Sequence, residues 1–268
     1  MANSDAGDRI TPPKSNPPPS DTLFGEYHAD VKPWKMLLYG ASGSGKTYMA
    51  GTFPDPIFID LEDGMRSLSV LGKKILRYPS DPTKVVDNFK LIPKIYQAIK
   101  ALNPREAPFK TIVVDSLNEL QVLMLKHALS LHSADRIYGD QPTIGDYGKL
   151  ARDMQSVVRD FFQLPFHIIF TVTAQDREYE DEKLYPMLVG KKSGPDLRRI
   201  SEQIGYCYTQ QKNKNEPPEH MVSFNDSPSF LAKDRSSFLT RPIPNNYQAM
   251  AKLAEETRKQ LQKRNTES

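Results

Sequence analysis

A glycine-rich segment that ends in a lysine and a threonine has the residue types needed to bind phosphate. Residues 40–47 match the pattern G-x-x-x-x-G-K-S/T and directly follow an apolar run, Met36 to Tyr39. In such a loop the backbone N–H groups converge on phosphate oxygens at the start of a helix. We expect Lys46 to reach the β- and γ-phosphates and Thr47 to bind Mg²⁺. The expected nucleotide-binding residues of this loop are Gly40, Ala41, Ser42, Gly43, Ser44, Gly45, Lys46 and Thr47.

The alternative is a glycine- and serine-rich loop that matches this pattern by chance. With average residue frequencies, a chance match is expected in about one chain in a hundred of this length. The apolar run before the segment and the helical pattern after it reduce that chance further. The pattern therefore favours a nucleotide site with ATP and Mg²⁺ as its cofactors.

A carboxylate to hold Mg²⁺ is expected at the end of a second apolar run. Thr111 to Asp115 are apolar except at their ends, and Asp115 lies where a parallel strand would reach the carboxyl edge of its sheet. This is the Walker B pattern, although a strand-terminal aspartate can also simply cap the next helix. Downstream of a phosphate-binding loop the metal role is favoured, so Thr47 and Asp115 are the predicted metal ligands.

The base that would activate water for hydrolysis is expected elsewhere, because Ser116 follows Asp115 where one large class of P-loop machines has glutamate. Phe58 to Gly64 contain an apolar run followed by acidic residues. If this run is a strand beside the phosphate-binding loop, Glu62 could orient a water in line with the γ-phosphate. The alternative for Glu62 is an exposed acid before a glycine turn. The predicted catalytic residues of the loop region are Glu62 and Lys46.

The elements that would position these residues follow from alternating apolar runs and amphipathic stretches, which are typical of an α/β fold with a mostly parallel central sheet flanked by helices. The predicted strands are 35–39, 56–60, 74–78, 111–115 and 167–173, and the predicted helices are 46–52, 83–101, 116–131 and 144–164. Later segments predict a helix at 196–204, late strands at 205–208, 221–224 and 230–232, possible partners in antiparallel pairs, and a final helix at 247–263.

The chain divides into three parts by composition. Residues 1–30 are rich in proline and polar residues and predict a disordered arm, 31–245 form the expected ATPase core, and 246–268 form a C-terminal helix with a charged tail. The 268 residues contain no apolar run near the roughly 18 that a membrane helix needs. The single cysteine, Cys207, is what a reducing cytoplasm permits. We therefore expect a cytoplasmic protein, in the host cytoplasm if the chain is phage-encoded.

With these residues placed, the chain resembles the RecA/DnaB class of P-loop ATPases. It is most similar to small phage RecA-like proteins grouped with single-strand annealing recombinases, over about Pro33 to Asn245. The resemblance depends on the phosphate-binding loop, on 58–62, on 112–116 and on 144–152. It implies a RecA-like core, ATP hydrolysis and, on the strand 167–173, a residue that senses the γ-phosphate, either Thr173 or Gln175.

The same resemblance implies a contribution from a neighbouring subunit. Lys233-Asp234-Arg235 resembles the K-x-R element that ring and filament relatives insert into a neighbour's ATP site. Alternation places Lys233 and Arg235 on one side of an extended segment, about 7 Å apart, so both could meet one triphosphate. This predicts a homo-oligomer, filament or ring, with both residues catalytic in trans. The alternative is a solvated pair of surface cations.

Single-stranded DNA is the partner that the resemblance implies. Residues 175–194 and 132–145 lie where the family has its DNA loops, and cations with aromatic side chains suit single-strand binding. Acidic residues share the later loop, and the net charge of +3 does not by itself indicate nucleic acid. The predicted function is DNA-stimulated ATP hydrolysis in recombination or annealing; the alternatives are a switch or assembly ATPase with a protein partner, such as a helicase loader, and a small-molecule kinase. The candidate DNA-contacting residues are Arg136, Arg177, Tyr179, Lys191 and Lys192.

Overall fold

The computed structural model of the chain describes residues 32–81, 83–131, 141–175, 182–188, 193–211, 213 and 216–266. From Pro33 onward the chain forms one compact unit. Among the helices within these ranges, none combines the length and the apolar character that crossing a bilayer requires.

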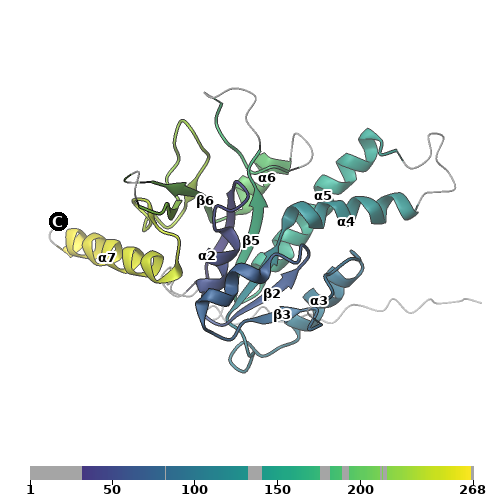
Figure 1. The fold of residues 1–268 in the computed structure, drawn as a ribbon, viewed down its shortest axis with the longest axis horizontal. Coiled ribbons are helices and arrows are strands. Elements are labelled where there is room, and N and C mark those ends of the chain that lie inside the picture. Colours follow the sequence, from purple (N-terminus) through teal and green to yellow (C-terminus); the bar gives the residue numbers. More distant parts are fainter. Residues whose placement is uncertain are drawn as a thin grey trace, which may run out of the picture. The chain divides into compact units, whose positions relative to one another are not determined.

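A central sheet organises this unit (Figure 1). Its parallel strands are β1 (Lys35–Gly40), β2 (Pro56–Asp60), β3 (Leu76–Tyr78), β4 (Thr111–Asp115), β5 (His167–Thr173) and β6 (Gln203–Gln210). The antiparallel strands β7 (Glu219–Ser223), β8 (Lys233–Asp234) and β9 (Ile243–Pro244) extend it beyond β6. The order is β3-β2-β4-β5-β1-β6-β7-β9, with β8 paired to β6. The expected mostly parallel sheet with late antiparallel strands is confirmed.

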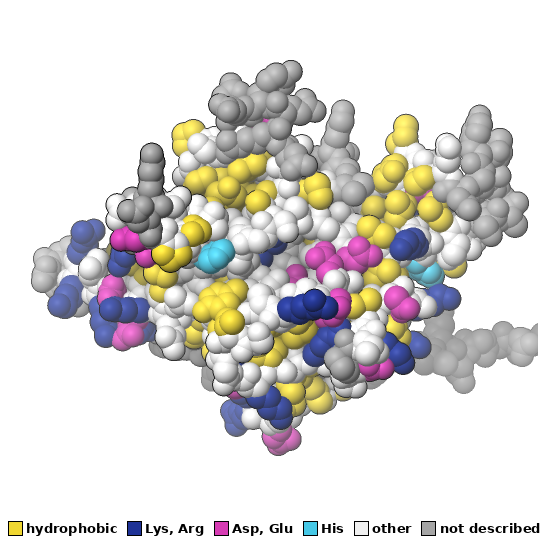
Figure 2. Space-filling view, viewed as in Figure 1, with side chains coloured by type: hydrophobic (Ala, Val, Ile, Leu, Met, Phe, Trp, Pro, Cys, Tyr) yellow, Lys and Arg dark blue, Asp and Glu magenta, His cyan; other side chains and the backbone are white. Residues whose placement is uncertain are grey.

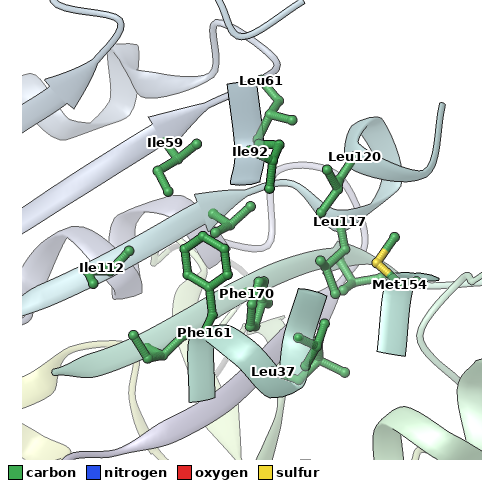
Figure 3. Close-up of a cluster of buried hydrophobic side chains, with 14 of the residues drawn as sticks. Leu37, Ile59, Leu61, Ile92, Ile112, Leu117, Leu120, Met154, Phe161 and Phe170 are labelled. Atoms are coloured by element: carbon green, nitrogen blue, oxygen red, sulfur yellow. The ribbon is translucent and has the colours of Figure 1, made fainter. Parts of the chain in front are cut away.

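Successive side chains of each strand point to opposite faces of the sheet, so strands made of consecutive apolar residues have two apolar faces. Helices cover both of these faces. Leu37 and Tyr39 of β1 face a core that includes side chains of α3 (Leu91–Lys100), α4 (Leu117–Leu131), α5 (Ile144–Gln163) and α6 (Ser193–Ile200). Figure 3 shows part of this core, where Phe161 of α5 lies against Phe170 of β5. Met36 and Leu38 face the opposite side of the sheet, where a second core forms.

The second core joins the helix after the phosphate-binding loop to the end of the chain. Side chains of α2 (Lys46–Thr52), η2 (Met65–Leu71) and α7 (Tyr247–Thr266) meet there. The backbone N–H of Tyr247 donates to the Thr52 hydroxyl at 2.8 Å, and the Phe53 and Tyr247 rings lie 4.7 Å apart. The final helix is thus packed on the helix that begins at the phosphate site. Cys207 is buried in this core.

Most predicted elements are confirmed to within a few residues, but two helix boundaries and one strand were wrong. Residues 83–90 are not helical: the N–H of Val86 donates to the carbonyl of Asp60 at the end of β2, and α3 begins only at Leu91. The helix predicted to run to 204 ends at Ile200, and β6 begins at Gln203. Residues 230–232 do not form a strand; the pairing with β6 is made by β8, immediately after them.

Candidate active site

The glycine-rich segment forms the turn between β1 and α2, as predicted. Gly43 and Gly45 have positive φ angles of 77° and 88°, which residues with a side chain rarely adopt. Gly40 lies so close to the neighbouring strand β6 that a Cβ there would be 2.2 Å from the Cys207 carbonyl oxygen. The N–H of Met49 donates to Gly45 O at 2.9 Å, so Gly45 is the N-cap of α2. The glycines therefore provide both the left-handed backbone and the close packing of this loop.

Asp115 at the end of β4 lies beside this loop. Its Oδ2 accepts a 2.8 Å hydrogen bond from the Thr47 hydroxyl, and its Oδ1 accepts one from the hydroxyl of Thr171 on β5. The carboxyl is buried, and this desolvation raises the pKa of Asp115, while the Thr171 and Thr47 hydroxyls act in the opposite direction. The predicted pair of Thr47 and Asp115 is thus assembled, with Thr171 as a third member that the sequence pattern did not indicate.

Lys46 points back toward the phosphate-binding loop. Its ammonium group donates to Gly40 O at 3.0 Å and to Ala41 O at 2.9 Å. Burial lowers the pKa of Lys46, and the nearby carboxylates of Asp115 and Glu62 oppose that shift. The ammonium is therefore held over the loop, where a phosphate could replace the carbonyl oxygens as its partner.

The residues present fit a nucleotide with Mg²⁺. Hydroxyl and carboxylate oxygens, such as those of Thr47 and Asp115, are the ligands that Mg²⁺ prefers. Ser44 is 4% exposed and its hydroxyl oxygen has no hydrogen-bond partner in the described part of the chain. A loop with left-handed glycines, a lysine and an unsatisfied hydroxyl is suited to accept an anion.

The backbone of Glu62 is positioned by an ion pair at the end of β2 between buried Asp60 and half-buried Arg77. The Oδ1 atom of Asp60 accepts hydrogen bonds from the N–H groups of Glu62 and Asp63, at 3.2 and 2.9 Å, and its Oδ2 atom accepts one from Arg77 Nε at 2.8 Å. β2 pairs with β4 so that Asp60 lies opposite Asp115. The Glu62 carboxylate accepts a hydrogen bond from the Ser116 hydroxyl. Glu62 therefore lies in an exposed loop after β2, near the end of β4. β2 and β1 are not neighbours, because β4 and β5 lie between them, so the strand adjacency on which the prediction for Glu62 depended is not found. The role of Glu62 as the base stays a prediction.

The sensor candidates lie at the end of β5, which separates the strands of the phosphate-binding loop and Asp115. Thr173 pairs with Gly40, and its N–H donates to Asn118 Oδ1 at 2.8 Å. Gln175 is exposed and its N–H donates to Tyr185 O at 2.8 Å. Thr171, two residues before Thr173 on the same face of the strand, is the residue that contacts Asp115. A hydroxyl within an otherwise apolar buried strand was the signal that could have identified it.

Lys233 and Arg235 lie against the last turn of α6 in their own chain. Lys233 Nζ donates to Arg198 O at 2.6 Å and to Ser201 O at 2.8 Å, and Arg235 Nη2 donates to Arg199 O at 2.7 Å. Burial lowers the pKa of Lys233, and the cations of Arg235 and Arg198 lower it further. Both side chains satisfy carbonyl groups at a helix C-terminus, where cations are favoured. Their contact with a neighbouring subunit's nucleotide stays a prediction.

The candidate DNA-contacting residues lie outside the residues that the structure describes. Figure 2 shows acidic and basic side chains mixed across the face on which α2 lies, with hydrophobic side chains gathered near α6. A single basic surface is therefore not what this face presents. The residues in question are Arg136, Arg177, Tyr179, Lys191 and Lys192.

The fold and this site together define a P-loop nucleoside triphosphatase. The chain belongs to the AAA domain family, whose model matches residues 32–236. Among the curated proteins, none matches the chain. A solved structure of a KaiC-like protein from the hyperthermophilic archaeon Pyrococcus horikoshii OT3 is similar, with 17% sequence identity over 78% of this chain and 84% of that chain and a TM-score of 0.44.

Proposed function

We propose that the protein hydrolyses ATP to ADP and phosphate, with Glu62 as the base. The observation that carries this proposal is the Glu62 carboxylate, which follows β2 and accepts a hydrogen bond from Ser116, the residue directly after Asp115. In this reaction a water attacks the γ-phosphorus, Glu62 takes the water's proton, and the bond between the γ-phosphorus and the β–γ bridging oxygen breaks. ADP leaves with that oxygen.

The other residues of the site have supporting roles. Lys46 exchanges the Gly40 and Ala41 carbonyls for phosphate oxygens and balances the negative charge that develops on them. Thr47 and Asp115 would hold Mg²⁺, which supplies positive charge to the phosphate oxygens when bound. Ser116 and the Asp60–Arg77 ion pair hold the Glu62 side chain and its backbone in place.

Glu62→Gln tests the assignment of the base. This variant keeps the shape of the side chain and an oxygen to accept from Ser116, but it cannot take up the proton. We expect kcat for ATP hydrolysis to fall about 10²- to 10⁴-fold, with ADP affinity close to that of the wild type. Glu106→Gln, at an exposed position in the turn before β4, is the matched control. Wild-type turnover by Glu62→Gln would remove Glu62 from the mechanism.

The proposal includes coupling of hydrolysis to single-stranded DNA. Two observations support it. One is the resemblance to the RecA/DnaB class, and the other is that both ends of the segment between Thr173 and Met187 lie next to the nucleotide site. The N–H of Met187 donates to Thr173 O at 2.8 Å and that of Gln175 to Tyr185 O, so the two ends of this segment pair beside Gly40. A strand of DNA bound there would act on residues next to the phosphate-binding loop.

An ATPase assay with and without a single-stranded oligonucleotide tests this coupling. We expect turnover to rise with DNA, and DNA binding to weaken steeply as salt increases, because phosphate contacts release counterions. Equal turnover with and without DNA would contradict the DNA part of the proposal. Stimulation by a purified protein instead would indicate an assembly or switch ATPase with a protein partner.

A further inference from the structure

A buried asparagine near the end of the chain contacts the phosphate-binding loop. Asn245 follows β9 and precedes α7, is 3% exposed, and lies beyond the residues that the family model matches. Its side-chain Nδ2 donates to Gly45 O at 2.8 Å, across 200 positions of sequence. The last part of the fold thus reaches the glycine that directly precedes Lys46.

This contact holds the peptide bond between Gly45 and Lys46. The Gly45 carbonyl accepts two hydrogen bonds, one from the N–H of Met49 and one from Asn245. A trans peptide is planar, with its C=O and N–H pointing in opposite directions. Fixing the Gly45 carbonyl therefore also fixes the direction of the Lys46 N–H, one of the donors that a phosphate-binding loop uses.

The asparagine is itself held in one orientation. Its backbone N–H donates to His220 O at 3.0 Å, and its Oδ1 accepts from the Cys207 thiol at 3.8 Å. Burial raises the pKa of Cys207 to about 12, so the thiol keeps the proton that it donates. With Oδ1 on the thiol, the amide NH₂ faces Gly45. The fit is close, since a Cβ at Gly45 would lie 2.5 Å from Asn245 Nδ2.

We propose that Asn245 is a positioning residue of the nucleotide site: it fixes the Gly45–Lys46 peptide in the orientation that binds phosphate. The inference deepens the proposed function and rests on it for the identity of the nucleotide. It predicts a residue that governs nucleotide affinity without touching the reacting atoms, so its loss changes KM and leaves kcat nearly unchanged.

The test compares Asn245→Ala with Asn246→Ala. Asn246 is the next residue, and its side chain caps α7 by accepting from the N–H of Ala249 at 2.8 Å, so its loss weakens the same junction without touching the loop. By titration calorimetry with ADP, we expect Asn245→Ala to raise Kd about fivefold to tenfold and Asn246→Ala to leave it unchanged. In the ATPase assay, Asn245→Ala should raise KM by a similar factor at nearly constant kcat.

Three outcomes would overturn the assignment. The first is that folded Asn245→Ala binds ADP as tightly as the wild type. The second is that both alanine variants weaken ADP binding equally, in which case the junction matters only for stability. If Asn245→Ala does not fold, the isosteric Asn245→Asp, which lacks the N–H donor, provides the third: wild-type affinity in this variant. A wild-type protein that binds ADP but does not hydrolyse ATP would refute the proposed hydrolysis and leave this test intact.

Discussion

Replacing Thr171 by valine should weaken Mg²⁺ binding in a pH-dependent way. Thr171 is fully buried on β5, and its hydroxyl donates to Asp115 Oδ1. Valine has nearly the same shape, so the change removes the hydroxyl without opening a large cavity. Asp115 then keeps the hydroxyl of Thr47 but has lost one of two donors that favour its ionised form.

The size of the effect follows from this lost hydrogen bond. A hydrogen bond to a charged group contributes about 1.5–3 kcal/mol, which corresponds to about tenfold to a hundredfold in an equilibrium constant. Burial already raises the pKa of Asp115, and removal of the Thr171 hydroxyl raises it further. Mg²⁺ binds the ionised carboxylate, so wherever Asp115 is protonated the metal must displace its proton. The whole penalty is therefore expected where the carboxyl is protonated, and it shrinks as pH rises and the carboxyl ionises in both proteins.

The assay is a titration of Mg²⁺ against a fluorescent ADP analogue, at mildly acidic and mildly alkaline pH. Thr171→Val should need more Mg²⁺ than the wild type, by up to about tenfold to a hundredfold, and the difference should shrink as pH rises. Thr171→Ser retains the hydroxyl and should follow the wild type. Equal Mg²⁺ dependence of Thr171→Val and the wild type at both pH values would refute the reasoning.

Three further outcomes can be measured. Gly45→Ala should lower thermal stability and weaken ADP binding more than tenfold, because its φ of 88° is strained for alanine and the new Cβ would lie 2.5 Å from Asn245 Nδ2. Urea unfolding should show stability falling by up to about 3 kcal/mol between about pH 6.5 and pH 4, because burial lowers the pKa of His167 from 6.5 to about 4 and only the unfolded chain takes up that proton in this range; His167→Gln should flatten the dependence. Mixing equal amounts of Glu62→Gln and Lys233→Ala should restore ATPase activity in up to about a quarter of sites if Lys233 acts in a neighbouring subunit, and none if it only caps α6.

The parts of the site that lie close together in sequence could be predicted from it. Gly40 to Thr47 match a motif of fixed glycine, lysine and threonine spacing, and an apolar run precedes them. Asp115 ends a second apolar run whose pattern predicts a buried strand. Glu62 could be proposed as the base because Ser116 follows Asp115 and another carboxylate was needed. Parallel strands then bring their carboxyl ends to one edge, which is why these residues meet.

The residues that hold the site in place could not be predicted, because their partners lie far away in sequence. Asn245 is 200 positions from Gly45, and Arg77 reaches Asp60 only because β3 pairs with β2. The helix expected at 83–90 failed for a related reason: Val86 is more stable bonded to the backbone of Asp60 and buried in the core than in a helical turn. Local pattern gives the chemistry of such a site, whereas tertiary contacts determine its support.

One such contact links the nucleotide site to the segment that follows β5. The Asn118 side chain, three residues after Asp115, accepts from the N–H of Thr173 at 2.8 Å and donates to Met187 O at 2.9 Å. It therefore holds both ends of that segment to the first turn of α4, directly after Ser116, which contacts Glu62. A partner that moves Met187 must stretch these bonds or move α4 with it. Any stimulation of hydrolysis by DNA or protein at this segment thus has a route to Glu62, the proposed base, through a few hydrogen bonds.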